Sequence, residues 1–527
     1  MEILGKSLIG FHDSRSTTGP FSAWNPASGE KIDATFYSAS HEDVEGAAKA
    51  ASDAFSSYAR LAGRERASFL NRIAARLESM VDLLVARAHA ETALPEPRLK
   101  SETARTCSQL RLFASVIEEG SWVSARIDHG DSERKPLPKP DIRSMLHPLG
   151  PVVVFGASNF PLAFSVAGGD TASALAAGNP VIVKAHPAHP GTSELVGRAI
   201  RECVREEGLA EGVFGLLFDS GNEVGAKLVQ HPLVKAVGFT GSIKAGRALM
   251  DLAVSRPEPI PFYGEMGSTN PVFILPGAMA LRGKEIASQL HASFTLGGGQ
   301  FCTKPGLVFL PPQHSSADFL PEFQAKVARS PKFTLLTSGI RDSYQREIQS
   351  RKGRSDLALV AEGEQPASGN AFLAGVAAFQ TDVPGLLRSP DLSSEVFGPS
   401  SVLVHFSNKR ELLDAARSLS GHLTATIHGT EEDLREFSDL VYLLQNKVGR
   451  IVFNGYPTGV EVSHAMIHGG PYPASTDSRT TSVGSQAIFR FARPVCYQDF
   501  PDSALPAELK DANPLGIWRM VDGKFAR

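Results

Sequence analysis

The sequence has no run of basic residues interleaved with aromatic side chains, and its formal net charge is −3 over 527 residues. A nucleic-acid surface needs clustered Lys and Arg to neutralise phosphates, so we expect no nucleic-acid partner. Long hydrophobic runs are also missing. The most apolar stretch, residues 152–167, is interrupted by Gly156, Asn159 and Pro161 and is too short to cross a bilayer. The start, MEILGKSLIG, lacks the features of a signal peptide, so we expect no membrane partner.

Cysteine is scarce. The four cysteines, Cys107, Cys203, Cys302 and Cys496, are far apart in the sequence. This usage is typical of a reducing compartment, and we expect free thiols and a cytoplasmic location. No CxxC or HxxxH pair and no acidic cluster offers metal-ligand spacing, so we expect no metal site.

The remaining composition is that of a globular protein of two to four domains, with 42% hydrophobic and 21% charged residues. Apolar residues recur every three or four positions through residues 41–118, which predicts helices. Between residues 150 and 260, short apolar strands alternate with helices, which predicts an α/β fold with a parallel, doubly wound sheet. The strands are PVVVFG, NPVIVKA, GVFGLLF and KAVGFTG, and the helices are expected at 160–178, 192–208, 222–230 and 242–254.

Four further regions lie outside this part of the chain. A second α/β region runs from Pro257 to about residue 455, with strands NPVFILP, GLVFL and VLVHF. Residues 120–145 contain two extended segments around a polar, proline-rich turn, which predicts a protruding β-hairpin. A small helix and a strand are expected within residues 479–497. The tail after Phe500 shows no periodicity and carries no functional interpretation.

Cys302 stands in an unusual context, GGGQFCTKP at residues 297–305. Glycines ahead of a cysteine allow an open loop to pass close to a ligand, as a catalytic nucleophile requires. Cys107 and Cys203 lie in predicted helices and suit packing better. The residues alone leave two interpretations of Cys302 open, a nucleophile and a buried loop cysteine.

Other candidates lie where strands end. Lys184 ends one strand, and Ser242 follows Gly241 at the predicted start of a helix, where free N–H groups and the helix dipole favour a phosphate. Glu265 ends another strand and could act as a general base through a water. The alternatives are a solvated lysine, a plain strand–turn–helix and a hydrogen-bonded carboxylate.

Taken together, these stretches resemble the aldehyde dehydrogenase superfamily over nearly the whole chain. The resemblance implies that Cys302 is the nucleophile, forming a thiohemiacetal and then a thioester. Asn159 and the Cys302 backbone N–H would stabilise the oxyanion, and Glu265 would activate the hydrolytic water. Ser268 replaces the second glycine of the family's usual Glu-Leu-Gly-Gly. The resemblance rests on FGASNFP (155–161), NPVIVKA (179–185), GFTGS (238–242), YGEMGSTNP (263–271), GQFCTKPG (299–306) and EVFGP (395–399).

The resemblance also implies a nicotinamide cofactor. It places Gly241 and Ser242 at the pyrophosphate and Lys184 at the adenosine ribose, and it places Glu395 and Phe397 at the nicotinamide ribose and ring.

The cofactor preference is predicted from position 187. Many NAD-preferring relatives carry a glutamate there, which would repel a 2′-phosphate. This chain has Pro187 instead, with His186 and His189 close by. We therefore expect NADP to be favoured and NAD to be tolerated.

Three stretches resemble the branch of α-ketoglutaric semialdehyde (2,5-dioxopentanoate) dehydrogenases. They are the C-terminal residues 453–484, KAHPAHPGTSE (184–194) and QLRLFA (109–114). The implied reaction converts 2,5-dioxopentanoate to 2-oxoglutarate. The alternative is an NADP-dependent dehydrogenase of medium- or long-chain aliphatic aldehydes. By motif position, Phe160, Phe164 and Phe301 would line the substrate tunnel. Arg479 could meet a carboxylate there or brace a loop.

The resemblance gives the domain expectations: a Rossmann-like cofactor domain (1–119 and 146–264), a catalytic domain (265–475), oligomerisation elements (120–145 and 476–500) and a tail (501–527). Exposed strand edges predict a homodimer or a tetramer of dimers. Two other classes of protein fit the sequence less well. A non-catalytic scaffold would not need Asn159, Glu265 and Cys302 together, and a thiol hydrolase would not need the cofactor residues.

Overall fold

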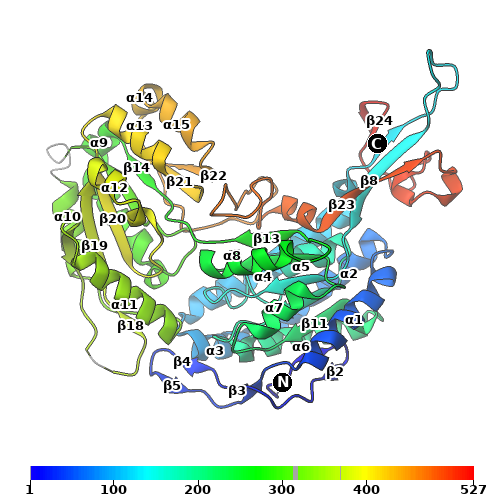
Figure 1. The fold of residues 1–527 in the computed structure, drawn as a ribbon, viewed down its shortest axis with the longest axis horizontal. Coiled ribbons are helices and arrows are strands. Elements are labelled where there is room, and N and C mark those ends of the chain that lie inside the picture. Colours follow the sequence, from blue (N-terminus) through cyan, green and yellow to red (C-terminus); the bar gives the residue numbers. More distant parts are fainter. Residues whose placement is uncertain (1, 313–317, 368) are drawn as a thin grey trace.

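The computed structural model describes residues 2–312, 318–367 and 369–527. Figure 1 shows two α/β lobes side by side and a β arm that projects from the first lobe. Within the described residues, no helix combines the length and the apolar character that a membrane crossing requires.

The first lobe is built on a seven-stranded sheet of order β13-β12-β9-β10-β11-β1-β2. The first five strands in this order are parallel, as the alternation of strands and helices predicts, and β1 joins β11 antiparallel. The five parallel strands bury nearly every residue and are mostly apolar. The strands of the whole sheet are β1 (Leu8–Ile9), β2 (His12–Asp13), β9 (Val152–Phe155), β10 (Val181–Lys184), β11 (Phe214–Leu217), β12 (Ala236–Thr240) and β13 (Phe262–Glu265).

Helices pack on both faces of this sheet. The helices predicted within residues 41–118 are confirmed. The first-lobe helices are α1 (His41–Tyr58), α2 (Gly63–Ser79), α3 (Val81–Thr92), α4 (Glu96–Glu119), α5 (Gly169–Ala177), α6 (Pro190–Glu206), α7 (Glu223–Gln230) and α8 (Ile243–Val254), with 3₁₀ turns η1 (Ser121–Val123) and η2 (Glu211–Val213).

The helix predicted over residues 160–178 is confirmed only in its second half, as α5, and the prediction is wrong for the first half. The chain folds back before it, and the Gly169 N–H donates to the Ala163 carbonyl. A side chain at Gly168 would lie 2.6 Å from that carbonyl oxygen. The glycine pair therefore makes a turn that ends the segment carrying Asn159 and Phe160.

The second lobe is a seven-stranded sheet of order β17-β19-β20-β15-β14-β21-β22, parallel except for β17. The three predicted strands are confirmed as β14, β15 and β20. Its strands are β14 (Val272–Ile274), β15 (Leu307–Leu310), β17 (Ala358–Glu362), β19 (Ala377–Asp382), β20 (Ser400–His405), β21 (His422–His428) and β22 (Val448–Phe453), beside the small pair β16 (Phe333–Thr334) and β18 (Leu373–Ala374). Its helices are α9 (Pro276–Thr295), α10 (Phe319–Ala328), α11 (Ser338–Lys352), α12 (Val383–Arg388), α13 (Lys409–Ser418), α14 (Glu431–Glu436) and α15 (Ser438–Leu444), with turns η3 (Leu296–Gly299) and η5 (Pro390–Ser393).

The projecting arm is a five-stranded sheet of order β23-β8-β7-β24-β25 (Figure 1). The predicted hairpin is confirmed as β7 and β8, and the predicted late helix and strand as the 3₁₀ turn η6 and β23. The tail after residue 500 completes this sheet, because β24 pairs with β7 in parallel. The elements are β7 (Arg126–Asp128), β8 (Ile142–Pro148), η6 (Ser485–Phe491), β23 (Ala492–Gln498), η7 (Asp502–Ala504), η8 (Ala507–Leu509), β24 (Arg519–Val521) and β25 (Lys524–Ala526).

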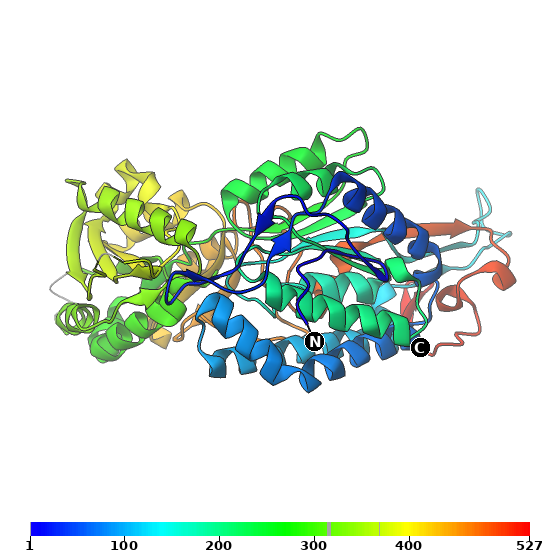
Figure 2. The same cartoon turned by 90° about the horizontal axis from the view of Figure 1, so that it is seen from below.

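The N-terminal segment connects the two lobes from below (Figure 2). After β1 and β2 it forms two short strand pairs, and the Phe372 N–H of the second lobe donates to the Pro26 carbonyl at 2.8 Å. The pairs are β3 (Pro20–Phe21) with β6 (Phe36–Tyr37) and β4 (Trp24–Asn25) with β5 (Glu30–Lys31).

Candidate active site

The three glycines before Cys302 form a left-handed turn at the end of α9. Gly297, Gly298 and Gly299 have φ values of 58°, 66° and 68°, which side chains disfavour. A Cβ on Gly299 would also lie 2.2 Å from the Gly398 carbonyl oxygen. The glycines therefore turn the chain sharply, and Cys302 lies in the loop that follows rather than in a helix or strand.

Two buried side chains hold this loop in place. The Asn270 side-chain amide donates to the carbonyls of Cys302 (2.8 Å) and Lys304 (3.0 Å). Gln300 donates to the Thr334 carbonyl (3.2 Å) and accepts from the Leu336 N–H (2.9 Å). Sequence reasoning missed Asn270 as a brace, although it lies within one of the quoted motifs.

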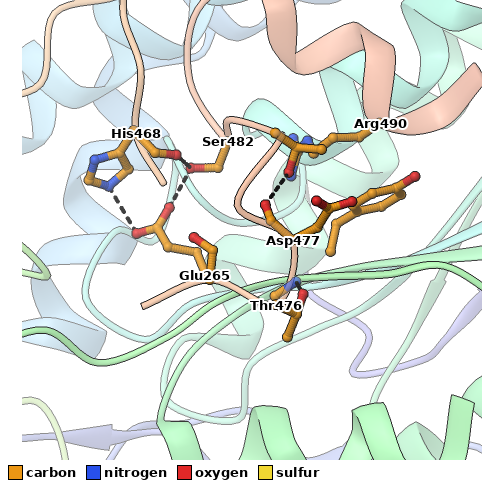
Figure 3. Close-up of a pocket in the computed structure, with 10 residues that line it drawn as sticks. Glu265, His468, Thr476, Asp477, Ser482 and Arg490 are labelled. Carbon is orange, nitrogen blue, oxygen red and sulfur yellow. Dashed lines mark hydrogen bonds and ion pairs between the residues drawn. The ribbon is translucent and has the colours of Figure 1, made fainter. Parts of the chain in front are cut away.

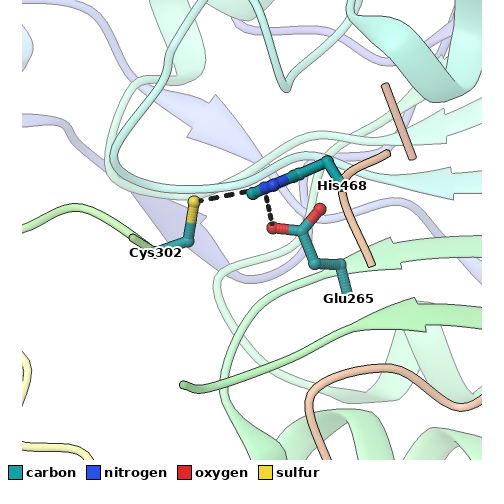
Figure 4. A group of neighbouring side chains, drawn as sticks. All are labelled: Glu265, Cys302 and His468. Atoms are coloured by element: carbon teal, nitrogen blue, oxygen red, sulfur yellow. Dashed lines mark hydrogen bonds and ion pairs between the residues drawn. The ribbon is translucent and has the colours of Figure 1, made fainter. Parts of the chain in front are cut away.

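Cys302 lies beside a buried histidine that sequence reasoning also missed. His468 Nε2 is 3.5 Å from Cys302 Sγ and 2.9 Å from Glu265 Oε1 (Figure 4). His468 is 1% exposed and lies in the loop before η6, which carries no periodic signal. The only signal available was its place in the C-terminal stretch that carries the branch resemblance. Three residues from distant parts of the chain thus meet at one point.

The same cluster bears on the expectation that the chain has no metal site. A carboxylate oxygen, a thiol sulfur and an imidazole nitrogen lie within 4.8 Å of one another. These are metal-ligand atom types. The expectation was drawn from local spacing, which cannot show a grouping of Glu265, Cys302 and His468.

Burial and charge oppose ionisation of the thiol. Burial, followed by the charges of Glu265 and Glu395, raises the pKa of Cys302 well above its ordinary value. Burial also acts to raise the pKa of Glu265, but the contacts with His468, Ser482 and Cys302 outweigh it and lower that pKa overall. The carboxylate therefore stays charged, while the thiol needs a proton acceptor to become a nucleophile.

Asn159 lies against the cysteine loop from the opposite lobe. Its side-chain amide donates to the Gln300 carbonyl at 3.0 Å, which leaves a second N–H for a ligand. Its own carbonyl accepts from Arg98 Nη2 at 2.8 Å. The position suits an oxyanion donor.

Behind Glu265 lies a small cavity, on the order of one water molecule in size. The Ser482 hydroxyl donates to Glu265 Oε2 (Figure 3). Arg490 Nη2, on the same lining, pairs with Asp170 at 2.7 Å. The polar lining can hold a water beside the carboxylate. The lining residues include Tyr263, Ser475, Thr476, Asp477 and Thr480.

The parallel strands of the first lobe bring the predicted cofactor residues to one edge. Lys184 ends β10, Gly241 and Ser242 follow β12, and Glu265 ends β13. Ser242 caps α8, and its hydroxyl accepts from the Ala245 N–H at 3.3 Å. The helix start is exposed, so its remaining N–H groups face solvent, and the site fits a pyrophosphate.

Two further cofactor candidates of the first lobe, Lys184 and His186, lie at the end of β10 and just after it. Lys184 donates to the Asp219 carbonyl at 3.0 Å, and burial lowers its pKa to about 8. His186 is half-buried and stacks on His189 at 5.6 Å. Burial, and then the neighbouring positive charges, hold the pKa of His186 well below its ordinary value, so it is neutral.

Glu395 and Phe397 come from the second lobe. A Cβ built on Gly267 would lie 2.4 Å from Glu395 Oε2, so the carboxylate would have to shift to admit a side chain there. Burial raises the pKa of Glu395 against the opposing effect of Lys304. Phe397 is half-buried in the loop after η5. Ser268, which replaces a glycine of the family pattern, donates its hydroxyl to Asn270 Oδ1 at 3.0 Å and so helps to hold Asn270.

The tunnel candidates separate into two groups. Phe160 lies 5.3 Å from both Phe164 and Phe301 by ring centroids, and Phe164 lies 6.4 Å from His468, so these three phenylalanines form one group, the tunnel cluster. Arg479 is 87% exposed, and its guanidinium bonds to Asp477 at 2.9 and 2.8 Å. It is a surface ion pair and offers no buried cation to a substrate.

Known proteins resemble this chain over nearly its full length. The model of the aldehyde dehydrogenase family matches residues 11–482. The chain is 48% identical to α-ketoglutaric semialdehyde dehydrogenase 2 of Azospirillum brasilense, covering 99% of this chain and all of the relative. It is 46% identical to α-ketoglutaric semialdehyde dehydrogenase of Acinetobacter baylyi, over 93% and 92% of the two chains.

Solved structures share the fold at low identity. A 1-pyrroline-5-carboxylate dehydrogenase from Thermus with bound NAD superposes with a TM-score of 0.79 at 20% identity, covering 94% of this chain and 92% of that one. A betaine aldehyde dehydrogenase from Staphylococcus aureus with NAD⁺ gives 0.81 at 18% identity, covering 97% and all of the two chains. The expected fold is therefore confirmed, and the chain belongs to the aldehyde dehydrogenase family.

Proposed function

We propose that this enzyme oxidises α-ketoglutaric semialdehyde to 2-oxoglutarate with a nicotinamide cofactor. The observation that carries the chemistry is the contact of Cys302 and Glu265 with one buried histidine. The substrate is supported by the relatives at 46–48% identity, which are named for this semialdehyde. The alternative, an aliphatic aldehyde dehydrogenase, has no such support.

The first step is attack of the Cys302 sulfur on the aldehyde carbon. His468 Nε2, at 3.5 Å, can accept the thiol proton, and the resulting imidazolium pairs with Glu265. The carbonyl oxygen becomes an alkoxide that the free Asn159 N–H and the Cys302 backbone N–H stabilise. The product of this step is a thiohemiacetal.

The second half releases the acid. A nicotinamide cofactor held by the predicted cofactor residues would supply the hydride acceptor, and loss of a hydride from the thiohemiacetal carbon would leave a thioester on Cys302. Glu265 then takes a proton from a water that attacks the thioester. Ser482 holds the carboxylate from behind, and the small cavity on that side can supply the water. The acid leaves, and the thiol is restored.

Cofactor binding follows from the strand ends of the first lobe. We propose that this lobe is the cofactor domain, with Ser242 and Gly241 at the pyrophosphate and Lys184 and His186 at the adenosine ribose. NADP is favoured, because Pro187 places no carboxylate beside the 2′-position. His186 is neutral, so it adds hydrogen bonds rather than charge, and NAD remains usable. Glu395 and Phe397 meet the nicotinamide half from the second lobe.

We also propose a homodimer or a tetramer built from dimers. Among the described residues, the strands β22 and β23 each pair on one side and leave the other edge free. Ile451 and Phe453 of β22 are 36% and 46% exposed, which a partner strand would cover.

The function is tested by comparing 2,5-dioxopentanoate with hexanal, using NADP and NAD, for the wild type and Cys302→Ser. We expect at least tenfold higher kcat/KM for the keto acid, about 1.4 kcal/mol of transition-state preference. Cys302→Ser should be inactive with both substrates. A preference for hexanal would refute the substrate assignment, and an active Cys302→Ser would refute the nucleophile.

A further inference from the structure

Helix α4 presents two arginines to the tunnel cluster. Arg98 and Arg105 are seven residues apart, so they lie on one face, two turns apart. The guanidinium carbon of Arg98 lies 4.6 Å from the ring centroid of Phe301 and 5.0 Å from that of Phe160. The guanidinium carbon of Arg105 lies 5.0 Å from that of Phe164. Two cations therefore border the aromatic wall that the substrate must pass.

The two arginines use their hydrogen bonds differently. Arg98 Nη2 donates to the Asn159 carbonyl at 2.8 Å, so Arg98 braces the catalytic loops, although its Nη1 has no hydrogen-bond partner among the described residues. Arg105 has only a long bond, from Nη2 to the Val460 carbonyl at 3.3 Å. Arg105 Nη1 is buried and has no hydrogen-bond partner among the described residues.

Arg105 also lacks a carboxylate partner. Glu102, one turn away, forms no ion pair with Arg105: its Oε1 accepts from the Leu162 and Ala163 N–H groups at 2.9 and 3.0 Å, and its Oε2 has no hydrogen-bond partner among the described residues. Two buried arginines pair with carboxylates: Arg490 with Asp170 and Arg198 with Glu194, both at 2.7 Å. Arg105 is half-buried, and its buried Nη1 without a partner is costly unless a ligand completes it.

Arg105 lies near the nucleophile, because the charges of Arg105 and Cys302 act on each other's pKa. Contacts run from Cys302 to His468 (3.5 Å), from that imidazole to the Phe164 ring (6.4 Å between centroids) and on to Arg105 (5.0 Å). The four carbon–carbon bonds of 2,5-dioxopentanoate span about 5 Å when extended, and a carboxylate–guanidinium hydrogen bond adds about 3 Å. The positive charge of Arg105 acts to lower the pKa of Cys302, although burial and the nearby carboxylates outweigh it.

We propose that Arg105 binds the carboxylate of the substrate and selects ω-oxo acids over uncharged aldehydes. This role replaces the one considered for Arg479. The inference rests on the proposed function and names the group that recognises the acid end of that substrate.

The test compares Arg105→Met, which keeps the length and removes the charge, with Arg105→Lys, which keeps the charge. Arg111→Met is the matched control, because Arg111 lies on the exposed face of α4 and pairs with Glu78. Each variant is assayed with 2,5-dioxopentanoate and with hexanal, and 2-oxoglutarate is tested as an inhibitor of hexanal oxidation.

With the keto acid, Arg105→Met should lose at least about tenfold in kcat/KM, mainly through KM. It should stay within about threefold of wild type with hexanal, which also shows that it folds. Arg105→Lys should retain part of the preference, and Arg111→Met all of it. Inhibition by 2-oxoglutarate should weaken in step with the loss of the charge.

Equal losses with both substrates would overturn the inference and make Arg105 a brace, and so would an unchanged preference. If the wild type prefers hexanal, the proposed function fails on its own. In that case the inhibition by 2-oxoglutarate still tests whether Arg105 binds a carboxylate. An inhibition constant for 2-oxoglutarate that is the same in Arg105→Met and wild type refutes it, and a constant raised at least about tenfold supports it.

Discussion

Replacing His468 by glutamine isolates the proton transfer that the site geometry implies. The Gln side chain can donate to Glu265, but it cannot accept the thiol proton. The thiol depends on such an acceptor, because burial and the nearby carboxylates raise the pKa of Cys302. General-base catalysis contributes about 10²–10⁴-fold, or roughly 3–5 kcal/mol. Glu265 remains beside the thiol as a weaker base, so we expect His468→Gln to lose about 10²-fold in kcat/KM at neutral pH.

The pH dependence gives the sign of the effect. Since the pKa of Cys302 is raised, the thiolate forms only as the pH rises. Without His468 the rate should keep climbing with pH where the wild-type rate has levelled. Alkylation of Cys302 by iodoacetamide without cofactor should slow in parallel and recover in alkali. His464→Gln, exposed in the same loop, is the control and should change neither rate.

His468→Gln could also lose activity for a reason unrelated to proton transfer. A double-mutant cycle with Glu265→Gln distinguishes that case from a shared role at the thiol. If both residues serve the same thiol, the two losses will not add. Wild-type rates and an unchanged pH profile in His468→Gln would refute the proton-acceptor role and leave His468 as a packing residue.

Four further predictions follow from single contacts. Glu265→Gln should keep a burst of reduced cofactor but slow steady turnover at least about 10²-fold; loss of the burst would assign Glu265 to the first step. Arg98→Met frees the Asn159 carbonyl, so kcat should fall with the keto acid and hexanal alike; a loss confined to one substrate would contradict this. Pro187→Glu places a carboxylate beside the 2′-position, and kcat/KM with NADP should fall at least about tenfold relative to NAD; an unchanged ratio would put the 2′-phosphate elsewhere. Gly299→Ala meets a carbonyl and a positive φ, so activity should be lost and the melting temperature should fall by several degrees, as for a loss of about 2 kcal/mol; a wild-type melting curve would contradict the left-handed turn.

Local patterns predicted most of the fold. The apolar strand PVVVFG became β9 because parallel strands buried on both faces must be uniformly apolar. Ser242 was correctly expected at a helix start, since its hydroxyl caps α8. The segment at 160–178 misled, because small apolar residues fit a helix and a tight turn equally well. The strand β24 was missed, because a three-residue strand in a polar tail has no periodicity to detect.

The site was predictable only as far as motifs extend. Cys302 and Glu265 lie in quoted motifs, and the fold brings both to one point. His468 comes from a loop, and its contact with them depends on packing between distant segments. Arg105 looked like any arginine on an amphipathic helix. The partial burial of Arg105 and its unpartnered Nη1 depend on the packing of α4 against the tunnel cluster.

The most direct test of the account is to trap the thioester. Glu265→Gln is mixed with 2,5-dioxopentanoate and NADP, quenched in acid and mapped by peptide mass spectrometry. We predict one 2-oxoglutaryl group per subunit on Cys302, formed as NADPH appears and removed by hydroxylamine. NADPH formation with an unmodified Cys302, or an acyl group on another residue, would contradict the central claim that Cys302 carries the substrate.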